Sequence, residues 1–130
     1  MELKTHLKID QKLSGKVIEL KSGYSKVLLK TTDIMRADER GLVHGGFIFS
    51  AADFSAMSAV NDEFVVLGSS CVRFIAPVVV GDEVIFEATL KEVQNKKHIV
   101  DVIAKVKDKE VFSGEFVTFV LDSHILEPKK

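Results

Sequence analysis

Residues 42–56, LVHGGFIFSAADFSA, are apolar almost all the way round, yet they contain one carboxylate, Asp53. Residues 45–60 are rich in Ala, Ser and Phe and poor in β-branched residues, which favours a helix over a strand. A surface helix has one apolar stripe, so a helix that is apolar around nearly its full circumference must be enclosed. Because burying an unpaired charge costs several kcal/mol, Asp53 either has partners or takes part in chemistry.

The segments on both sides of this helix are short, rich in apolar and β-branched residues, and separated by turns. They predict strands at residues 15–20, 24–31, 64–76, 82–93, 97–107 and 110–121. The turn at residues 21–23 predicts a hairpin between the first two strands, and short turns predict an antiparallel meander for the last four. We therefore expect an α+β fold in which a curved antiparallel sheet of five to six strands wraps one central helix.

The 130 residues fit one domain, with residues 1–14 as an N-terminal extension and residues 122–130 as a tail. The formal net charge of -1 provides no electrostatic basis for binding nucleic acid. One cysteine excludes an intrachain disulfide, and the four histidines lack metal-ligand spacing. No apolar run is long enough for a signal peptide or a membrane span, so we expect a cytoplasmic protein without a metal or a resident cofactor.

Residues 66–78, VLGSSCVRFIAPV, form a long segment with several serines and small residues. We expect this segment to lie at an edge of the sheet, where it can pair with its copy in another subunit. The prediction is a homodimer, or a dimer of such dimers. Cys71, within the segment, is expected to be buried and unreactive.

The string HGG at residues 44–46 is followed seven residues later by Asp53, and FIAPV at residues 74–78 is followed by a Gly-Asp turn at residues 81–82. In this order, over roughly residues 15–121, the chain resembles the hotdog-fold acyl-CoA thioesterases of the phenylacetic-acid-degradation type. The stretches VRFIAPVVVGDEV and KEVFSGEFVTFVL also resemble the ligand-sensing hotdog domain of the bacterial fatty-acid-synthesis repressor that reads malonyl-CoA. The helix acid is absent from that sensor. Both resemblances imply a hotdog fold and an acyl-CoA ligand, but they differ on catalysis.

Gly45 and Gly46 stand where the chain enters the helix, and the first amides of a helix have no intrahelical acceptor. Without a Cβ, a thioester carbonyl can approach this backbone closely, and the positive helix end stabilises negative charge on its oxygen. The alternative is that the two glycines only form a tight corner between loop and helix. His44 either orients the thioester or the loop, or simply bonds nearby backbone.

Asp53 lies eight positions beyond Gly45, about two turns inward, where the helix dipole helps its anionic form little. Desolvation is expected to raise the pKa of its carboxyl group, which suits a base that takes a proton from water. Direct attack on the thioester is the other catalytic route, and an acid that only caps backbone at a dimer seam is the structural alternative. Ser50 shares the helical face of Asp53, so it is a candidate to bond Asp53 or the substrate.

Six positions before His44, the thioesterases of the resembled type usually carry an asparagine that orients water or substrate, but this chain has Asp38. Either Asp38 is a second acid near Asp53 that raises the pKa of the pair, or it faces solvent in the charged loop RADER. Further binding candidates are Ser69 and Ser70 beside the helix, and Arg73, Lys96 and Lys97 as cations for the phosphates of coenzyme A. Small residues in a crowded sheet and solvated charges are their structural alternatives.

Two functions are therefore predicted. One is the hydrolysis of an acyl-CoA thioester to free acid and coenzyme A at a dimer interface, with the Gly45 amide polarising the carbonyl and Asp53 acting as base or nucleophile. The other is a non-catalytic acyl-CoA-binding or sensing module that acts through a partner. Only about 14 residues precede the first strand, too few for a helix-turn-helix, so we do not expect this chain itself to bind DNA.

Overall fold

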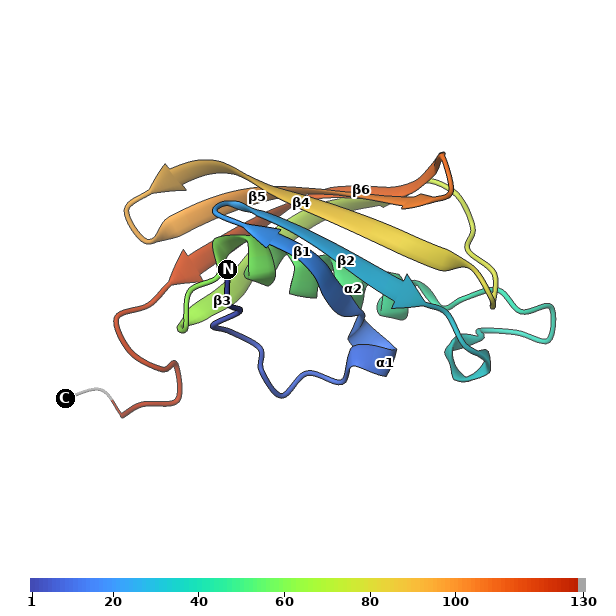
Figure 1. The fold of residues 1–130 in the computed structure, drawn as a ribbon, viewed down its shortest axis with the longest axis horizontal. Helices are drawn as coiled ribbons and strands as arrows, with labels where there is room; N and C mark the ends of the chain where they lie inside the picture. Colours follow the sequence, from blue (N-terminus) through green and yellow to red (C-terminus); the bar gives the residue numbers. More distant parts are fainter. Residues whose placement is uncertain (129–130) are drawn as a thin grey trace.

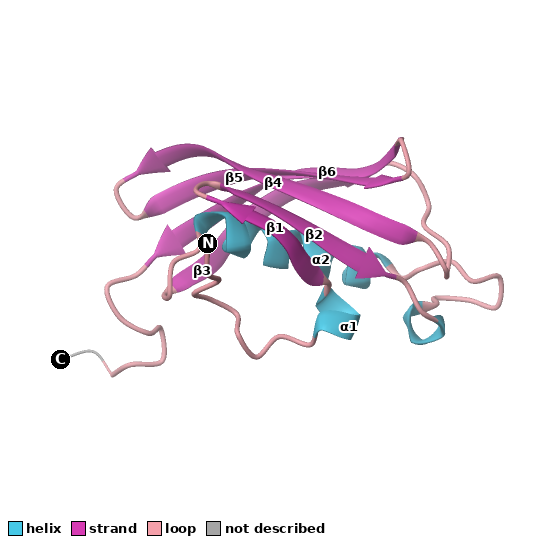
Figure 2. Cartoon of the chain, in the orientation of Figure 1, coloured by secondary structure: helices cyan, strands magenta, loops and turns pink. Residues whose placement is uncertain are grey.

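The computed structural model describes residues 1–128. One long helix, α2 (Gly45–Val60), lies against one face of a six-stranded antiparallel sheet (Figures 1 and 2). A short helix, α1 (Gln11–Ser14), and a 3-10 helix, η1 (Asp33–Met35), lie outside the sheet. The strands are β1 (Lys16–Lys21), β2 (Tyr24–Lys30), β3 (Val65–Phe74), β4 (Glu83–Gln94), β5 (Lys97–Val106) and β6 (Lys109–Val120). The predicted α+β architecture of one central helix and a curved antiparallel sheet is confirmed.

The strand order in the sheet is β1-β2-β4-β5-β6-β3. Strands β4, β5 and β6 form the predicted meander, but β3 does not join β4. Instead β3 pairs with β6, from Val65 opposite Val120 to Phe74 opposite Phe112. The prediction of a four-strand meander was wrong because residues 75–82 cross from the edge of the sheet to its interior, and turn residues do not specify which strand pairs with which. The crossover leaves β3 at an edge, as expected.

Helix α2 is enclosed mainly through small side chains. Its buried residues are Ile48, Ala51, Ala52, Phe54, Ser55, Ala56, Met57, Ser58 and Ala59. The large aromatic rings of Phe86, Phe112 and Phe116 come from the sheet and belong to the same core. The buried hydroxyls of Ser55 and Ser58 donate to helix carbonyls at 2.7 Å, so they carry no unpaired polar group into the core. Within residues 1–128, no helix is long and apolar enough to cross a membrane.

The N-terminal segment, residues 1–14, runs along α2 on the side away from the sheet (Figure 1). The amide of Lys4 donates to the side chain of Asn61 at the end of α2, at 2.7 Å. Near the other end, the hydroxyls of Ser14 and Ser50 share a hydrogen bond of 2.7 Å. The segment therefore covers the helix face that the sheet leaves open, which explains how a helix without a polar face is tolerated.

Gly15 connects α1 to β1 with a φ of +91°, and a Cβ there would lie 2.6 Å from Cγ1 of the buried Val27. Gly81 also has a positive φ, +102°, but a Cβ there would meet nothing within 4 Å. We expect Gly15→Ala to lower the free energy of unfolding by about 2 to 5 kcal/mol, because overpacking adds to backbone strain. Gly81→Ala adds strain alone, about 1 to 2 kcal/mol. Chemical denaturation of both variants tests this, and equal losses would contradict the role of Val27.

Candidate functional site

Helix α2 begins in a hydrogen-bonded corner centred on His44. The ring Nδ1 of His44 accepts from the amide of Gly46 at 2.8 Å, so this nitrogen carries no proton. The backbone amide of His44 donates to the carbonyl of Met35 at 2.9 Å, and its carbonyl accepts from the amide of Phe47 at 3.1 Å. The amide of Gly45 donates no hydrogen bond within residues 1–128. At the positive end of the helix, the amide of Gly45 is therefore free to donate a hydrogen bond, whereas the amide of Gly46 is already bonded to the His44 ring.

An apolar pocket of about 290 Å³ lies beside this free amide. It is lined by Leu42, Val43, Gly45, Ile48, Phe74, Ile75, Ala76, Pro77, Val78 and Val111. A Cβ on Gly45 would lie 3.2 Å from Cε1 of Phe74, so the absence of a side chain lets the ring and the helix start lie close together. We call this cavity the apolar pocket.

A second, more open groove of about 580 Å³ borders a different face of the helix start. It is lined by Leu13, Ser14, Arg36, His44, Gly46, Phe47 and Ser50, which supply hydroxyl, imidazole and guanidinium groups. Ser50 bonds Ser14 rather than Asp53, so the predicted hydrogen bond between Ser50 and Asp53 is not formed. We call this hollow the polar groove.

Asp53 lies near the middle of α2 and is half-buried. Its Oδ1 atom is buried without a hydrogen-bond partner in the described chain, which is an exception among buried polar groups. Burial raises the pKa of the Asp53 carboxyl to about 6, because desolvation disfavours the charged form. This confirms the expected direction. A carboxylate with a pKa near the working pH is suited to accept a proton and to release it again.

The free amide and the buried carboxylate are far apart on one helix. Gly45 and Asp53 are separated by eight residues, which at 1.5 Å per residue is roughly 12 Å along the axis. Groups that act on the same carbonyl must lie within about 3 to 3.5 Å of the reacting atoms. One thioester therefore cannot use both groups of a single chain directly.

Asp38 shapes the exposed loop that precedes α2. Its Oδ1 accepts from the amides of Arg40 and Leu42, at 2.9 and 3.2 Å. Leu42 in turn bridges to Val79 and lines the apolar pocket. Within one chain Asp38 lies in the exposed loop and bonds only backbone amides of that loop. The side-chain oxygen of an asparagine would accept the same two bonds, so an aspartate at this position preserves the loop.

Strand β3 carries three of the remaining candidates. Ser69, Ser70 and Cys71 are exposed on this edge strand. The expectation that Cys71 is buried was wrong, because within one chain β3 has a neighbouring strand on one side only. Within residues 1–128, no three His, Cys, Asp or Glu side chains are grouped as metal ligands would be.

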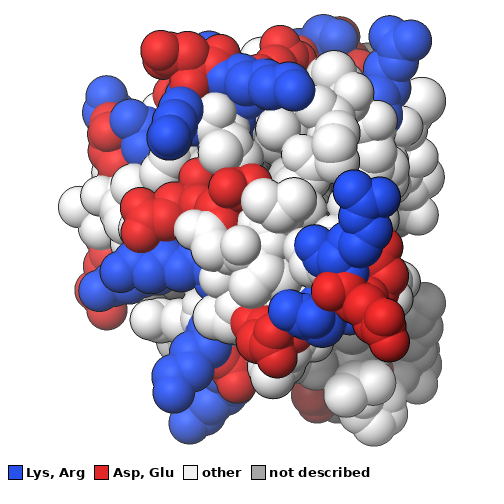
Figure 3. Space-filling model, turned by 90° about the vertical axis from the view of Figure 1, so that its right-hand side faces the viewer, with Lys and Arg blue, Asp and Glu red and all other residues white. Residues whose placement is uncertain are grey.

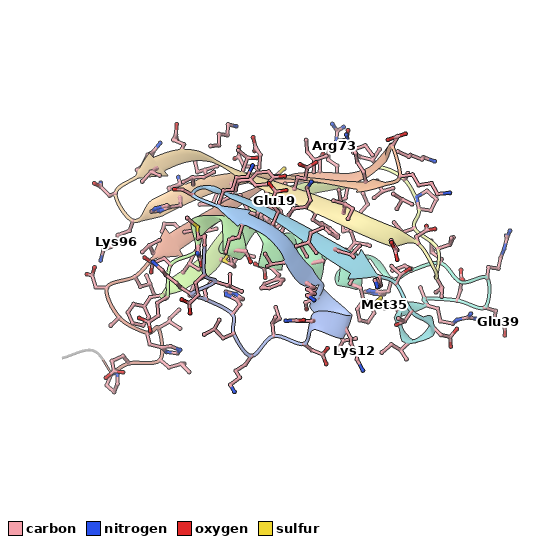
Figure 4. The ribbon with its side chains drawn as sticks, in the orientation of Figure 1. Lys12, Glu19, Met35, Glu39, Arg73 and Lys96 are labelled. Atoms are coloured by element: carbon pink, nitrogen blue, oxygen red, sulfur yellow. The ribbon has the colours of Figure 1, made fainter. Side chains whose placement is uncertain are left out.

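The predicted phosphate-binding cations lie apart. Lys97 is opposite Phe119, which is opposite Val66 on β3, whereas Arg73 lies seven residues further along β3. At 3.3 Å per residue this separation is roughly 23 Å. Figure 4 shows Lys96, the neighbour of Lys97, and Arg73 at opposite ends of the sheet. Within one chain, Arg73 and Lys97 therefore do not form one phosphate site, and Lys96 already pairs with Asp122 at 2.7 Å.

Two walls of the apolar pocket were not predicted. Val111 belongs to β6 and reaches the pocket only because β6 pairs with β3, which no local pattern signals. Ile48 is one of many apolar residues of α2, and nothing in the sequence distinguishes this pocket residue from residues that only fill the core. The segment FIAPV at residues 74–78 and the glycine Gly45 are the sequence signals that pointed to this region.

The single helix enclosed by an antiparallel sheet defines a hotdog-fold protein. A family model described as "Fluoroacetyl-CoA-specific thioesterase" (FlK) matches residues 51–124. The chain therefore belongs to this family of hotdog-fold, thioesterase-like proteins, which confirms the resemblance found in the sequence.

Solved structures agree with this assignment. The uncharacterized protein PH1136 from Pyrococcus horikoshii is 46% identical, with a TM-score of 0.96 over 98% of each chain. The PaaI protein from the phenylacetic acid degradation operon of E. coli is 21% identical, with a TM-score of 0.78 over 86% of this chain and 83% of that one. A hypothetical thioesterase from Streptococcus pneumoniae TIGR4, solved with coenzyme A, is 17% identical, with a TM-score of 0.76 over 84% and 87%. The last two show the fold alone.

Curated relatives are longer than this chain. A stretch of the methylthioribose-1-phosphate isomerase of Aquifex aeolicus is 51% identical over 94% of this chain but only 27% of that protein. The transcription factor FapR of Thermoanaerobacter sp. (strain X514) is 31% identical over 88% of this chain and 58% of its own length. This chain thus spans about a quarter of the first relative and little more than half of the second.

The raised pKa of Asp53 predicts how stability depends on pH. Between the ordinary value of 3.8 and about 6, the folded chain holds a proton that the unfolded chain has released, so stability falls as the pH rises. The difference corresponds to at most about 3 kcal/mol. We expect Asp53→Asn to be more stable than the parent above pH 6 by up to this amount, and equally stable near pH 4. Denaturant melts at both pH values test this, with Asp38→Asn as the control; a less stable Asp53→Asn at pH 7.5 would contradict it.

Proposed function

We propose that this protein binds an acyl-CoA and hydrolyses its thioester to free acid and coenzyme A, at a site formed between two copies of the chain. The observation that carries the proposal is a half-buried carboxylate, Asp53, whose Oδ1 is buried without a partner, on the same helix as a free N-terminal amide, Gly45. Membership of a thioesterase-like family supports the reaction class, and the coenzyme A in a hotdog relative supports the ligand.

The Gly45 amide binds the thioester carbonyl oxygen in this mechanism. As the carbonyl carbon becomes tetrahedral, negative charge collects on that oxygen, and the N–H dipole at the positive helix end stabilises it. Loss of one such donor typically raises the barrier by roughly 3 to 4 kcal/mol. The missing Cβ of Gly45 leaves room for the close approach.

Asp53 takes a proton from water while the water oxygen bonds to the carbonyl carbon. The carbon–sulfur bond then breaks, and the proton passes to the leaving thiolate, so the carboxylate is restored. In the other route the carboxylate attacks the carbonyl carbon, the carbon–sulfur bond breaks to release the coenzyme A thiolate, and water hydrolyses the resulting anhydride to free acid and the restored carboxylate. A single turnover in ¹⁸O-water distinguishes them, because only anhydride hydrolysis can leave label in the Asp53 side chain.

A second copy of the chain brings the two groups together in this proposal. Strand β3 is an edge strand that carries no charged side chain from Val65 to Val72 and is exposed from Gly68 to Cys71. Edges that must stay unpaired usually carry charges or proline, so this edge suits pairing with its own copy about a two-fold axis. Such pairing continues the sheet and places both α2 helices on the same face, as a shared site requires.

A second candidate function is a non-catalytic acyl-CoA-binding or sensing module that acts through a partner. The observation that favours it is the partial coverage of the curated relatives: the matching stretch is 27% of an isomerase and 58% of a transcription factor. The same fold thus occurs as one part of longer proteins whose names describe other activities.

A panel of acyl-CoAs, assayed for both thiol release and thermal shift, discriminates the two candidates. For the enzyme we expect turnover that falls at least about 10²-fold in Asp53→Asn and Asp53→Ala, while ligand stabilisation persists. Stabilisation of the parent without turnover would support the module. Full turnover in Asp53→Asn would remove its catalytic role, and neither stabilisation nor turnover would contradict both candidates.

The shared site predicts complementation between two inactive variants. Gly45→Pro removes the N–H at the first helical position, where proline is well tolerated, and His44, with φ -62° and ψ 132°, already has the conformation that precedes proline. Gly45→Ala adds the same contact with Phe74 but keeps the N–H, so we expect it to be at least about 10²-fold more active than Gly45→Pro.

Subunit exchange between Gly45→Pro and Asp53→Asn creates mixed dimers that each contain one intact site. We expect recovery of up to about a quarter of the parental activity, because about half of the dimers are mixed and one of their two sites works. No recovery despite verified exchange would place both groups within one chain. A stable monomer in sedimentation would contradict the shared site altogether.

A further inference from the structure

We propose that the apolar pocket beside Gly45 holds the acyl group of the ligand, that it selects short acyl groups without charge or hydroxyl substituents, and that Phe74 sets the length limit. This inference rests on the proposed function, because it assigns one part of the same acyl-CoA. It goes beyond it by naming the class of acyl group and the residue that selects it.

The two hollows at the helix start differ in the side chains that line them, because polar and charged side chains occur only in the polar groove. The polar groove is lined by the hydroxyls of Ser14 and Ser50, the His44 ring and the guanidinium of Arg36, which suit the amides and phosphates of the coenzyme A arm. The Arg36 guanidinium pairs with the exposed Asp33 at 2.8 Å, so a phosphate bound there shares or replaces that partner. The side chains that line the apolar pocket are all hydrocarbon. Gly45 lies in the wall of the pocket, so a carbonyl bound to its amide would stand beside this cavity, and the proposal places the acyl carbons there.

Apart from the amide of Gly45, which the proposed mechanism assigns to the thioester carbonyl, the side chains in the walls of the apolar pocket offer a polar substituent no partner. None of its lining side chains carries a charge or a hydrogen-bonding group. Two amides of the walls are already bonded: that of Val43 donates to the Val78 carbonyl at 2.8 Å, and that of Ile75 donates to the Val111 carbonyl at 2.8 Å. A carboxylate placed there would be a buried unpaired charge, and a hydroxyl would lose its hydrogen bonds to water.

The surface at this end of the molecule agrees with such a pocket. Figure 3 views the end where the β5–β6 hairpin and the loop before α2 lie, and it shows uncharged surface between side chains of both signs. Around the pocket, Leu42, Phe74 and Ile75 expose 39%, 56% and 50% of their surface. Apolar side chains thus continue from the pocket walls to the surface beside it.

Phe74 is placed to limit the length of the acyl group. Its ring packs edge-to-face on the buried Phe112, with ring centres 5.3 Å apart and planes at 73°, which supports it from behind. Its other side lies beside Gly45 and faces the pocket. The volume of about 290 Å³ is at the small end for ligand pockets, so removing this ring should lengthen the accepted chain.

Acyl-CoAs matched in carbon number test the selectivity. We expect kcat/KM for butyryl-CoA to exceed that for 3-hydroxybutyryl-CoA by about 10- to 100-fold, and that for succinyl-CoA by at least about 10³-fold. If the parent binds without turnover, the same ratios are read from Kd values. Succinyl-CoA used as well as butyryl-CoA would overturn this inference while leaving the proposed function standing; no binding or cleavage of any acyl-CoA would overturn both.

Variants of Phe74 test its role. We expect Phe74→Ala to raise kcat/KM for octanoyl-CoA relative to butyryl-CoA by at least about 10-fold, and Phe74→Leu to restore part of the parental profile. Ile103→Ala, on the exposed outer face of β5, is the matched control and should leave the profile unchanged. An unchanged profile in a folded, dimeric Phe74→Ala would overturn the assignment. Dissociation of Phe74→Ala into inactive monomers would equally overturn it, by making Phe74 a subunit contact.

Discussion

The enclosure of α2 is the constraint on which the rest of this structure depends. A helix with apolar residues on nearly every side cannot face water, so the sheet covers one side and residues 1–14 cover the other. Small residues such as Ala51 and Ala52 let the strands approach, and Phe86, Phe112 and Phe116 fill the remaining space. The sheet curves because it must follow one cylinder rather than a flat layer.

The same enclosure creates the chemical character of the site. The Oδ1 atom of Asp53 is buried without a partner, and this desolvation raises the pKa of the carboxyl to about 6, close to neutral pH. At the start of the helix, the His44 ring accepts a hydrogen bond from the amide of Gly46, and the amide of Gly45 stays free. A single rigid helix holds these two groups roughly 12 Å apart, so their cooperation depends on assembly rather than on local flexibility.

Much of the fold was predictable from residue patterns. Hydrophobic periodicity and residue composition indicated the central helix and all six strands, because both are determined by neighbouring residues within one short segment. The pairing of β3 with β6 was not predictable, since a crossover of residues 75–82 and a direct turn have similar composition. Within the candidate site, Gly45 was predictable from its place at the start of the helix, and Asp53 as an acid in an apolar segment. The contribution of Val111 to the pocket was not predictable.

The sequence by itself determined that Asp53 would lie on an apolar helix that begins with Gly45 and Gly46, because all three residues belong to one contiguous segment. Only the tertiary structure decided which partners these residues have. It showed that Asp38 holds a loop, that Ser50 bonds Ser14, and that Arg73 and Lys97 are separated. The physical reason is that propensity and periodicity are local properties, whereas hydrogen-bond partners and pocket walls come from segments brought together by strand pairing.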